Sequence, residues 1–182
     1  MSSRWLAPAL LALACAGCAS LSETECRSAN WKEIGYADGS KGARAKRADE
    51  HASACAQHGL SMDREAWAHG YERGLELYCT PENALQLGLH GGDYSGACPP
   101  VSELGFTSHW RAGRVVWEQR QRVAQLAERR RQLEYAYQNA EGDQQRYNVR
   151  VELARADEQL RYEERRLYEE EARLQEFLNG PR

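Results

Sequence analysis

The chain has 182 residues, 42% of them hydrophobic and 28% charged, and a formal net charge of −3. This length suffices for one domain with an appendage, and the small net charge argues against a nucleic-acid partner. The sequence contains no phosphate-binding loop or dinucleotide fingerprint, and Ser95 stands in YSGAC rather than in a nucleophile elbow. We therefore expect no enzymatic activity and no cofactor.

The first 17 residues are typical of a bacterial export signal. Arg4 supplies a positive charge, and the apolar stretch from Trp5 to Gly17 is too short to span a membrane as a helix. Ala16-Gly17-Cys18 resembles the lipobox of lipoproteins, although Cys15 stands where leucine is usual. The resemblance implies cleavage before Cys18 and its lipidation with acyl chains such as palmitate, which insert in the lipid bilayer. An ordinary secretory signal or an uncleaved anchor is the alternative.

The residue that follows Cys18 bears on localisation. It is Ala19 rather than aspartate, and by resemblance to other lipoproteins this implies the outer membrane, with the protein facing the periplasm. We expect residues 18–25 to form a polar tether.

Four cysteines remain in the exported part besides Cys18: Cys26, Cys55, Cys79 and Cys98. An even number in an oxidising compartment predicts two disulfides. If the chain reverses at 39–42, Cys26 pairs with Cys55 and Cys79 with Cys98. If 30–57 is a single helix, the crossed pairing of Cys26 with Cys79 and Cys55 with Cys98 is easier. The smaller loops favour the first pairing, and the second stays open.

Two stretches place glycines at helical spacing. Gly35 and Gly39 follow Trp31, and Gly70 and Gly74 follow Trp67, each set on one face of a helix. Glycine inside a helix costs roughly 1 kcal/mol relative to alanine, and close contact between two helix backbones would offset that cost. The pattern therefore predicts helix–helix packing, with a ligand-contacting backbone surface as the alternative.

Turn and capping residues divide the rest of this block. We expect one helix over about 41–57 and a second that begins after Asp63, its N-cap, and runs to Cys79. Thr80-Pro81 should end this helix. The stretch 83–100 is rich in glycine and ends in Pro99-Pro100, which predicts a loop.

The block as a whole resembles a known family. It reads W-x2-IG-x2-DG-x2-G, then a histidine and a cysteine, then D-x3-W-x2-GY-x2-GL-x2-YC, then G-x3-G-x-YSGACP. This order of motifs is similar to a family of uncharacterised Gram-negative lipoproteins that is known only as a domain of unknown function. The resemblance covers Cys26 to Gly113. It implies a small cell-envelope domain and no known activity.

From Phe106 onward the pattern predicts a long helix with a heptad seam, followed by a second one. The first seam comprises Val116, Gln119, Val123, Leu126, Arg130, Leu133, Tyr137 and Ala140, and the second comprises Val149, Leu153, Ala156, Leu160, Leu167, Leu174 and Phe177. The stretch 139–143 separates them, and Glu163 and Glu170 occupy apolar positions of the second seam. We expect an antiparallel, coiled-coil-like hairpin over 110–182, after a disulfide-stapled helical domain over 26–109.

We expect the hairpin, Arg111 to Leu178, to mediate association with a protein partner or with itself. Tyr147, Tyr162 and Tyr168 would form a contact strip together with Leu167 and Leu174, because the second seam is imperfect. The fold class predicted from the sequence is thus mainly α. The predicted function is a non-enzymatic lipoprotein of the outer membrane with a structural or protein-interaction role.

One alternative is a periplasmic metal- or ligand-binding module. His51, Cys55 and His58 would share one helical face, and His69 on the following helix would be a further ligand. A disulfide at Cys55 would remove that ligand, so we expect no metal. The carboxylates that hydrolysis would need are scattered over Asp38, Asp49, Glu50, Asp63 and Glu65.

Overall fold

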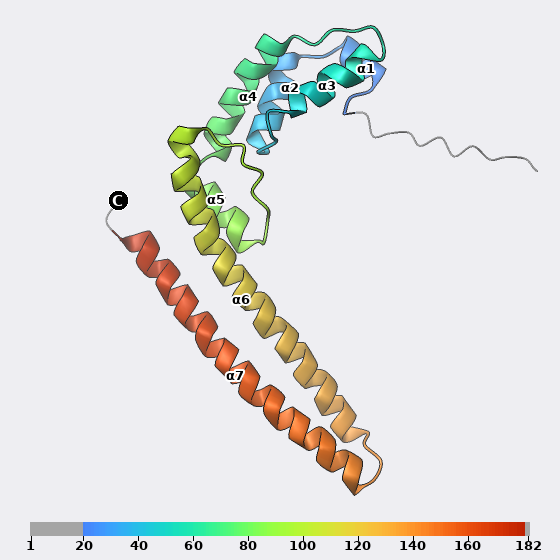
Figure 1. Ribbon diagram of the computed structural model, residues 1–182, viewed down its shortest axis with the longest axis vertical. Coiled ribbons are helices and arrows are strands. Elements are labelled where there is room, and N and C mark those ends of the chain that lie inside the picture. The colour runs from blue at the N-terminus through green and yellow to red at the C-terminus, as the bar shows by residue number, and fades with distance from the viewer. Residues whose placement is uncertain (1–19, 181–182) are drawn as a thin grey trace, which may run out of the picture.

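The computed structural model describes residues 20–180, and over this range the chain forms helices and no strand (Figure 1). The elements are α1 (Glu23–Arg27), α2 (Trp31–Ser40), α3 (Arg47–Ala56), α4 (Arg64–Tyr78), α5 (Pro81–Leu89), α6 (Pro100–Gln138) and α7 (Asp143–Asn179). The mainly α fold class is confirmed. The predicted signal peptide, 1–17, and Cys18 lie outside the described residues. None of the described helices combines the length and apolar character that crossing a membrane requires.

The glycine stripes lie in the contact between α2 and α4. A Cβ added to Gly35 would lie 2.0 Å from the carbonyl oxygen of Trp67, and one added to Gly74 would lie 2.4 Å from that of Tyr36. Gly39 and Gly70 are equally confined by the opposite backbone. The two helices therefore meet backbone against backbone, and the aromatic side chains of Trp67 and Tyr71 pack beside the contact.

The disulfides are Cys26–Cys55 and Cys79–Cys98, the first of the two pairings that the sequence left open. The chain reverses after α2, and α3 begins at Arg47 instead of Lys41 as predicted. The reason is Gly42, which has a φ of +67° and lies so close to Tyr78 that a Cβ would come within 2.1 Å of its ring. That conformation ends the helical path, so residues 41–46 form the turn.

The stretch from residue 83 was predicted as a loop, and this prediction is wrong for its first half. Thr80 caps α5 by accepting a hydrogen bond from the backbone N–H of Asn83 (3.2 Å), and Pro81 occupies the first turn. Gly88 is a packing residue here, because its Cβ would lie 2.1 Å from the carbonyl oxygen of Trp110 on α6. The loop itself is confined to residues 90–99.

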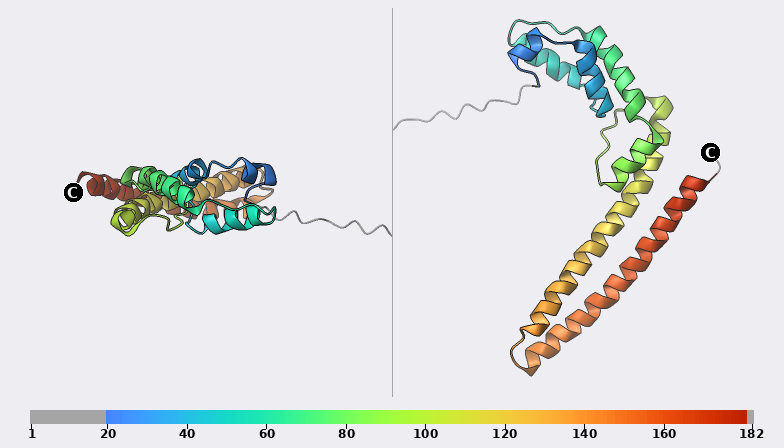
Figure 2. Two further views of the ribbon diagram at one scale, coloured as in Figure 1. Left: turned by 90° about the horizontal axis from the view of Figure 1, so that it is seen from above. Right: turned by 180° about the vertical axis from the view of Figure 1, so that it is seen from behind.

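Helices α6 and α7 form the antiparallel hairpin, and they lie side by side in both long views (Figures 1 and 2). Helix α6 begins at Pro100, earlier than the predicted Phe106, and it passes the expected boundary at 109–110 without a break. Its first turns pack in the disulfide domain, where Phe106 is 1% exposed, and its later turns build the hairpin. The domain and the hairpin therefore share one helix.

The two seams meet along the hairpin. Val116, Ala156 and Leu174 are buried, and Glu163 accepts hydrogen bonds from the buried Gln119. Burial of Leu174, 8% exposed, corrects the expectation that this residue is available to a partner. The tyrosines of the predicted strip are exposed: Tyr147 by 62%, Tyr162 by 52% and Tyr168 by 76%.

Candidate functional site

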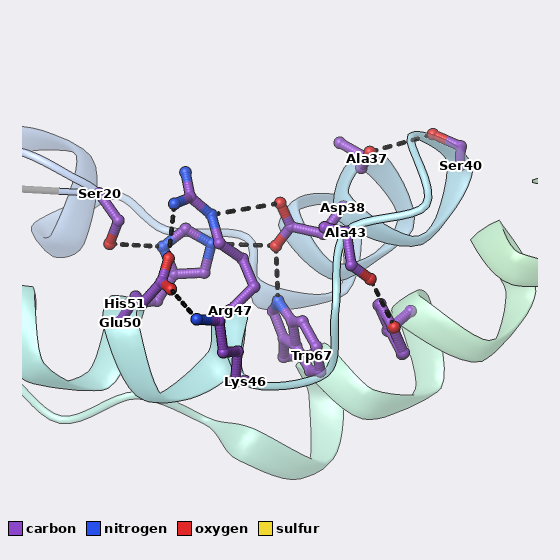
Figure 3. A network of polar contacts seen from close by, with 11 residues as sticks. Ser20, Ala37, Asp38, Ser40, Ala43, Lys46, Arg47, Glu50, His51 and Trp67 are labelled. Atoms are coloured by element: carbon purple, nitrogen blue, oxygen red, sulfur yellow. Dashed lines mark hydrogen bonds and ion pairs between the residues drawn. The ribbon is translucent and has the colours of Figure 1, made fainter. Parts of the chain in front are cut away.

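A buried histidine links the start of the described chain to the helical domain (Figure 3). The Nε2 atom of His51 lies 2.9 Å from Asp38 Oδ2, and its Nδ1 atom lies 2.9 Å from the hydroxyl oxygen of Ser20. The same Asp38 oxygen accepts a hydrogen bond from Trp67 Nε1 at 2.9 Å. We call these four residues, Ser20, Asp38, His51 and Trp67, the Ser20 clamp.

Three helices position the Ser20 clamp. Asp38 lies on α2 next to Gly39, so the close α2–α4 contact brings its carboxylate to Trp67 on α4. His51 lies on α3 one turn before Cys55, whose disulfide to Cys26 fixes α3 against α1. Trp31 packs beside the imidazole, with the two ring centroids 6.4 Å apart. The core around Trp31 and the Cys26–Cys55 disulfide therefore hold both the segment around Ser20 and helix α3.

The Ser20 clamp is largely buried, and the chemistry of its partners assigns the hydrogen-bond donors and acceptors. The His51 side chain is 3% exposed and that of Asp38 is 16% exposed. A carboxylate only accepts hydrogen bonds, so Nε2 of His51 carries a proton. The Ser20 hydroxyl can donate to Nδ1 when the imidazole is neutral and accept from it when the imidazole is charged.

Arg47 and Glu50 border the clamp on the solvent side. Arg47 Nε lies 4.0 Å from Asp38 Oδ1, and its Nη1 donates to Glu50 Oε2 at 2.8 Å. The hydrogen bond from Arg47 lowers the pKa of the Glu50 carboxyl. Figure 3 shows the two side chains next to the imidazole, beside Ser20.

The order serine, imidazole, carboxylate is that of a general-base relay, in which the imidazole takes a proton from the hydroxyl. In this structure the His51 side chain is only 3% exposed, because Trp31 packs beside it and Asp38 is hydrogen-bonded to it. Each polar atom of the group already has a partner within the protein. These contacts hold the segment around Ser20 on the domain.

Further contacts fasten the segment that was expected to be a tether. Ser22 caps α1 through a reciprocal pair of hydrogen bonds with Glu25. Leu21 packs against the core around Trp31, and Glu23 lies 3.7 Å from His58. Residues 20–25 are therefore a folded part of the domain.

The three histidines of the metal alternative do not gather. His51 is held by Ser20 and Asp38, His58 follows the end of α3 beside Glu23, and His69 is exposed on α4. Cys55 is in a disulfide. Within residues 20–180 no group of three histidine, cysteine or acidic side chains is placed to hold a metal ion.

Sequence reasoning missed the Ser20 clamp, although one signal for it was present. Asp38 follows Trp31 by two helical turns and stands between Gly35 and Gly39, on the face that packs. A carboxylate on a packing face needs a buried hydrogen-bond donor. Which donors serve it, His51 and Trp67, depends on the arrangement of three helices.

No curated protein and no solved structure gives a significant match to the chain. A family model matches residues 30–115, which includes α2 to α5, both predicted glycine stripes and the first turns of α6. This stretch lies close to the block from Cys26 to Gly113 in which the sequence resembles a domain of unknown function. The family whose model matches residues 30–115 is described as "Protein of unknown function (DUF2799)".

Proposed function

We propose that the protein is a non-enzymatic lipoprotein of the outer membrane, acylated at Cys18, that holds a stiff helical hairpin for a protein partner. The supporting observation is the contact between Ser20 and His51, 2.9 Å from oxygen to nitrogen. Ser20 is two residues after Cys18, and two extended residues span at most about 7 Å. A lipid on Cys18 would therefore hold the domain at the bilayer surface.

Helix α6 transmits this restraint to the hairpin. Phe106 in the domain and Val116 in the hairpin, each 1% exposed, belong to the same uninterrupted helix. A helix of 39 residues is about 58 Å long. The hairpin thus extends from the domain as a continuation of its core. A partner bound to it would be held at a defined place relative to the membrane.

The outer face of α7 offers contacts for such a partner. Tyr147, Tyr162 and Tyr168 are more than half exposed. Tyrosine combines a large apolar ring with a hydroxyl, and it is enriched in protein interfaces for that reason. Because Leu174 is buried, these aromatic rings, rather than the leucines of the seam, would form the contact.

The anchor is tested with Cys18→Ser. We expect the wild-type chain in the outer-membrane fraction, with a mature N-terminus whose mass includes acyl chains, and the variant in the soluble periplasm or unprocessed. Cys15→Ser is the control, and it should remain acylated and membrane-bound. An unmodified Cys18 in the wild-type protein would contradict the proposal.

The role of the hairpin is tested by shortening it. Truncation after Gly113 would also remove Arg114 and Trp117, which contact Gly91 near the end of α5, and so would damage the domain. Deletion of 125–138 together with 143–156 removes two heptads from each helix and keeps the register of the rest. Because Tyr162 and Tyr168 remain, the variant also carries Tyr162→Ala/Tyr168→Ala, and we expect it to stay folded and membrane-bound but to lose its partner in in-cell crosslinking. Retention of every crosslinked partner would reduce the hairpin to a passive appendage.

A further inference from the structure

The turn between α2 and α3 is basic. Together with Arg47, the first residue of α3, it contains Lys41, Arg44 and Lys46 within seven residues and no acidic residue. Lys41, Arg44 and Lys46 are exposed, and Arg47 is half-buried. The turn leads directly into α3, and the first backbone N–H groups of that helix donate to carbonyl groups of the turn, such as Arg47 N–H to Arg44 at 2.9 Å. We call residues 41–47 the basic turn.

The basic turn lies beside the Ser20 clamp. Arg47 approaches one oxygen of Asp38, and the other oxygen of Asp38 contacts His51, which holds Ser20. Figure 3 shows the Arg47 side chain beside the imidazole and Lys46 directed toward Glu50. The basic turn is therefore close to the point at which the chain leaves the domain toward Cys18.

Neighbouring carboxylates neutralise only part of its charge. Glu50 is shared between Lys46 at 3.9 Å and Arg47 at 2.8 Å. Neither Lys41 nor Arg44 forms an ion pair with another residue of the described part of the chain. Arg44 instead donates from Nε to the backbone carbonyl of Ser95 at 2.6 Å, which fixes its guanidinium while leaving the other nitrogens available.

A hollow of about 410 Å³ opens between the basic turn and the loop before α6. Its lining consists of Ala43, Arg44, Lys46, Arg47, Glu50, Asp93, Tyr94 and Ser95. Asp93 is paired with Arg114 at 3.1 Å, so it offsets little of the charge of the basic turn. An open, positively charged hollow of this size can receive a phosphate group.

We infer that the basic turn is a second membrane contact, which binds the phosphates of anionic phospholipids beside the acylated N-terminus. The inference rests on the proposed acylation for its place at the bilayer, because Ser20 is within two residues of Cys18. Basic clusters next to a membrane anchor are attracted to anionic lipids, and one lipid signal combined with such a cluster gives firmer attachment than either alone. The contact would also set the orientation of the hairpin.

The test uses the mature chain, residues 18–182, with Cys18→Ser, so that binding does not depend on acyl chains. Flotation is measured with vesicles of phosphatidylcholine alone and with vesicles that also contain phosphatidylglycerol. We expect binding to the anionic vesicles only, weakened at least tenfold when salt is raised from low to physiological concentration. Binding should also fall at least tenfold in Lys41→Gln/Arg44→Gln/Lys46→Gln.

The matched control is Arg129→Gln/Arg161→Gln/Arg165→Gln, which removes as many exposed charges from the hairpin. It should bind like the parent. If Arg44→Gln disturbs folding, as seen in the melting temperature, Lys41→Gln/Lys46→Gln replaces the triple variant and should still weaken binding. Equal binding to neutral vesicles, or equal losses in the control, would overturn the inference.

The two proposals fail separately. Loss of anionic binding while cellular Cys18 carries acyl chains overturns the basic turn and leaves the anchor. Specific anionic binding while cellular Cys18 is unmodified overturns the anchor and supports the basic turn.

Discussion

Gly35 packs directly on the backbone of Trp67. A Cβ at Gly35 would lie 2.0 Å from the carbonyl oxygen of Trp67 and 2.9 Å from the backbone nitrogen of Tyr71. Backbone atoms cannot move aside as the end of a flexible side chain can. Any residue larger than glycine therefore has to push α2 and α4 apart.

Gly35→Ala should lower the free energy of unfolding by about 1–3 kcal/mol, because the added methyl group overpacks the helix contact. The matched control is Gly105→Ala in α6, where nothing lies within 4 Å of the added Cβ. There alanine should stabilise by up to about 1 kcal/mol through its higher helix propensity. Urea denaturation of both variants checks the prediction, which fails if the two substitutions have the same sign.

Asp38→Ala should destabilise by about 2–3 kcal/mol, because it leaves buried N–H groups of His51 and Trp67 without their acceptor. Asp49→Ala removes an equally charged side chain from an exposed ion pair with Arg64 and should cost less than about 1 kcal/mol. Equal losses in the two variants would contradict the importance of the Ser20 clamp. Hydrogen exchange should also show faster exchange at Leu21 in Asp38→Ala.

Cys26→Ser/Cys55→Ser should cost about 3–4 kcal/mol, since the disulfide closes a loop with a sequence separation of 29 in the unfolded chain. The pair Cys79→Ser/Cys98→Ser, with a separation of 19, should cost a similar amount. The two disulfides stabilise different parts of the domain. Limited proteolysis should cut near α1 in the first variant and between α5 and α6 in the second, and the reverse pattern would contradict the pairing.

Stability should fall in alkaline solution because of Tyr94. Burial, reinforced by the hydrogen bond that its hydroxyl donates to Glu103, raises the pKa of Tyr94 to about 12. An unfolded tyrosine has a pKa of about 10. Below pH 10 the phenol is protonated in both states and its stabilisation is complete. Between pH 10 and 12 only the unfolded state ionises, so the free energy of unfolding decreases.

Burial also raises the pKa of Tyr71 and Tyr78, which adds to the same decline. Tyr94→Phe should therefore lower stability at pH 8, through the lost hydrogen bonds, but show a shallower decrease from pH 10 to 12. Chemical denaturation across this range measures both effects. An unchanged slope in Tyr94→Phe would show that Tyr94 does not carry the dependence.

The sequence predicted the structural features that depend on residues close together in the chain. Asp63 caps α4 as expected, because the cap needs only its own side chain and the N–H of Ala66. Helix α5 was missed because Thr80-Pro81 both ends one helix and starts the next, and because Gly88 is a packing residue instead of a turn residue. The sequence analysis considered His51 only as a ligand in the metal-binding alternative and missed its actual partners, Ser20 and Asp38, because they come from elsewhere in the chain.

A buried polar contact joins the two helices of the hairpin, and we expect it to set their register. Gln119 is fully buried, and its Nε2 atom donates to the backbone carbonyl of Glu163 at 2.9 Å and to its carboxylate at 2.6 Å. The Oε1 atom of Gln119 accepts from Arg122 at 2.6 Å, which completes its hydrogen bonds. A slip of one heptad toward the tip would place Gln119 opposite the buried Ala156, where its amide would have no partner side chain.

Glu163→Leu alone should lower the free energy of unfolding by about 1–3 kcal/mol, because the buried amide of Gln119 loses its carboxylate partner. Gln119→Leu/Glu163→Leu should recover most of this loss or exceed the wild type, since two apolar side chains suit the seam better than a polar pair. The same double variant should lose the unique register. Spin labels at Arg129 and Tyr162 would then report a broadened distance distribution where the wild type gives a single peak. A coupling energy near zero in the double-mutant cycle, together with an unchanged distance distribution, would show that the leucines of the seam set the register without this contact.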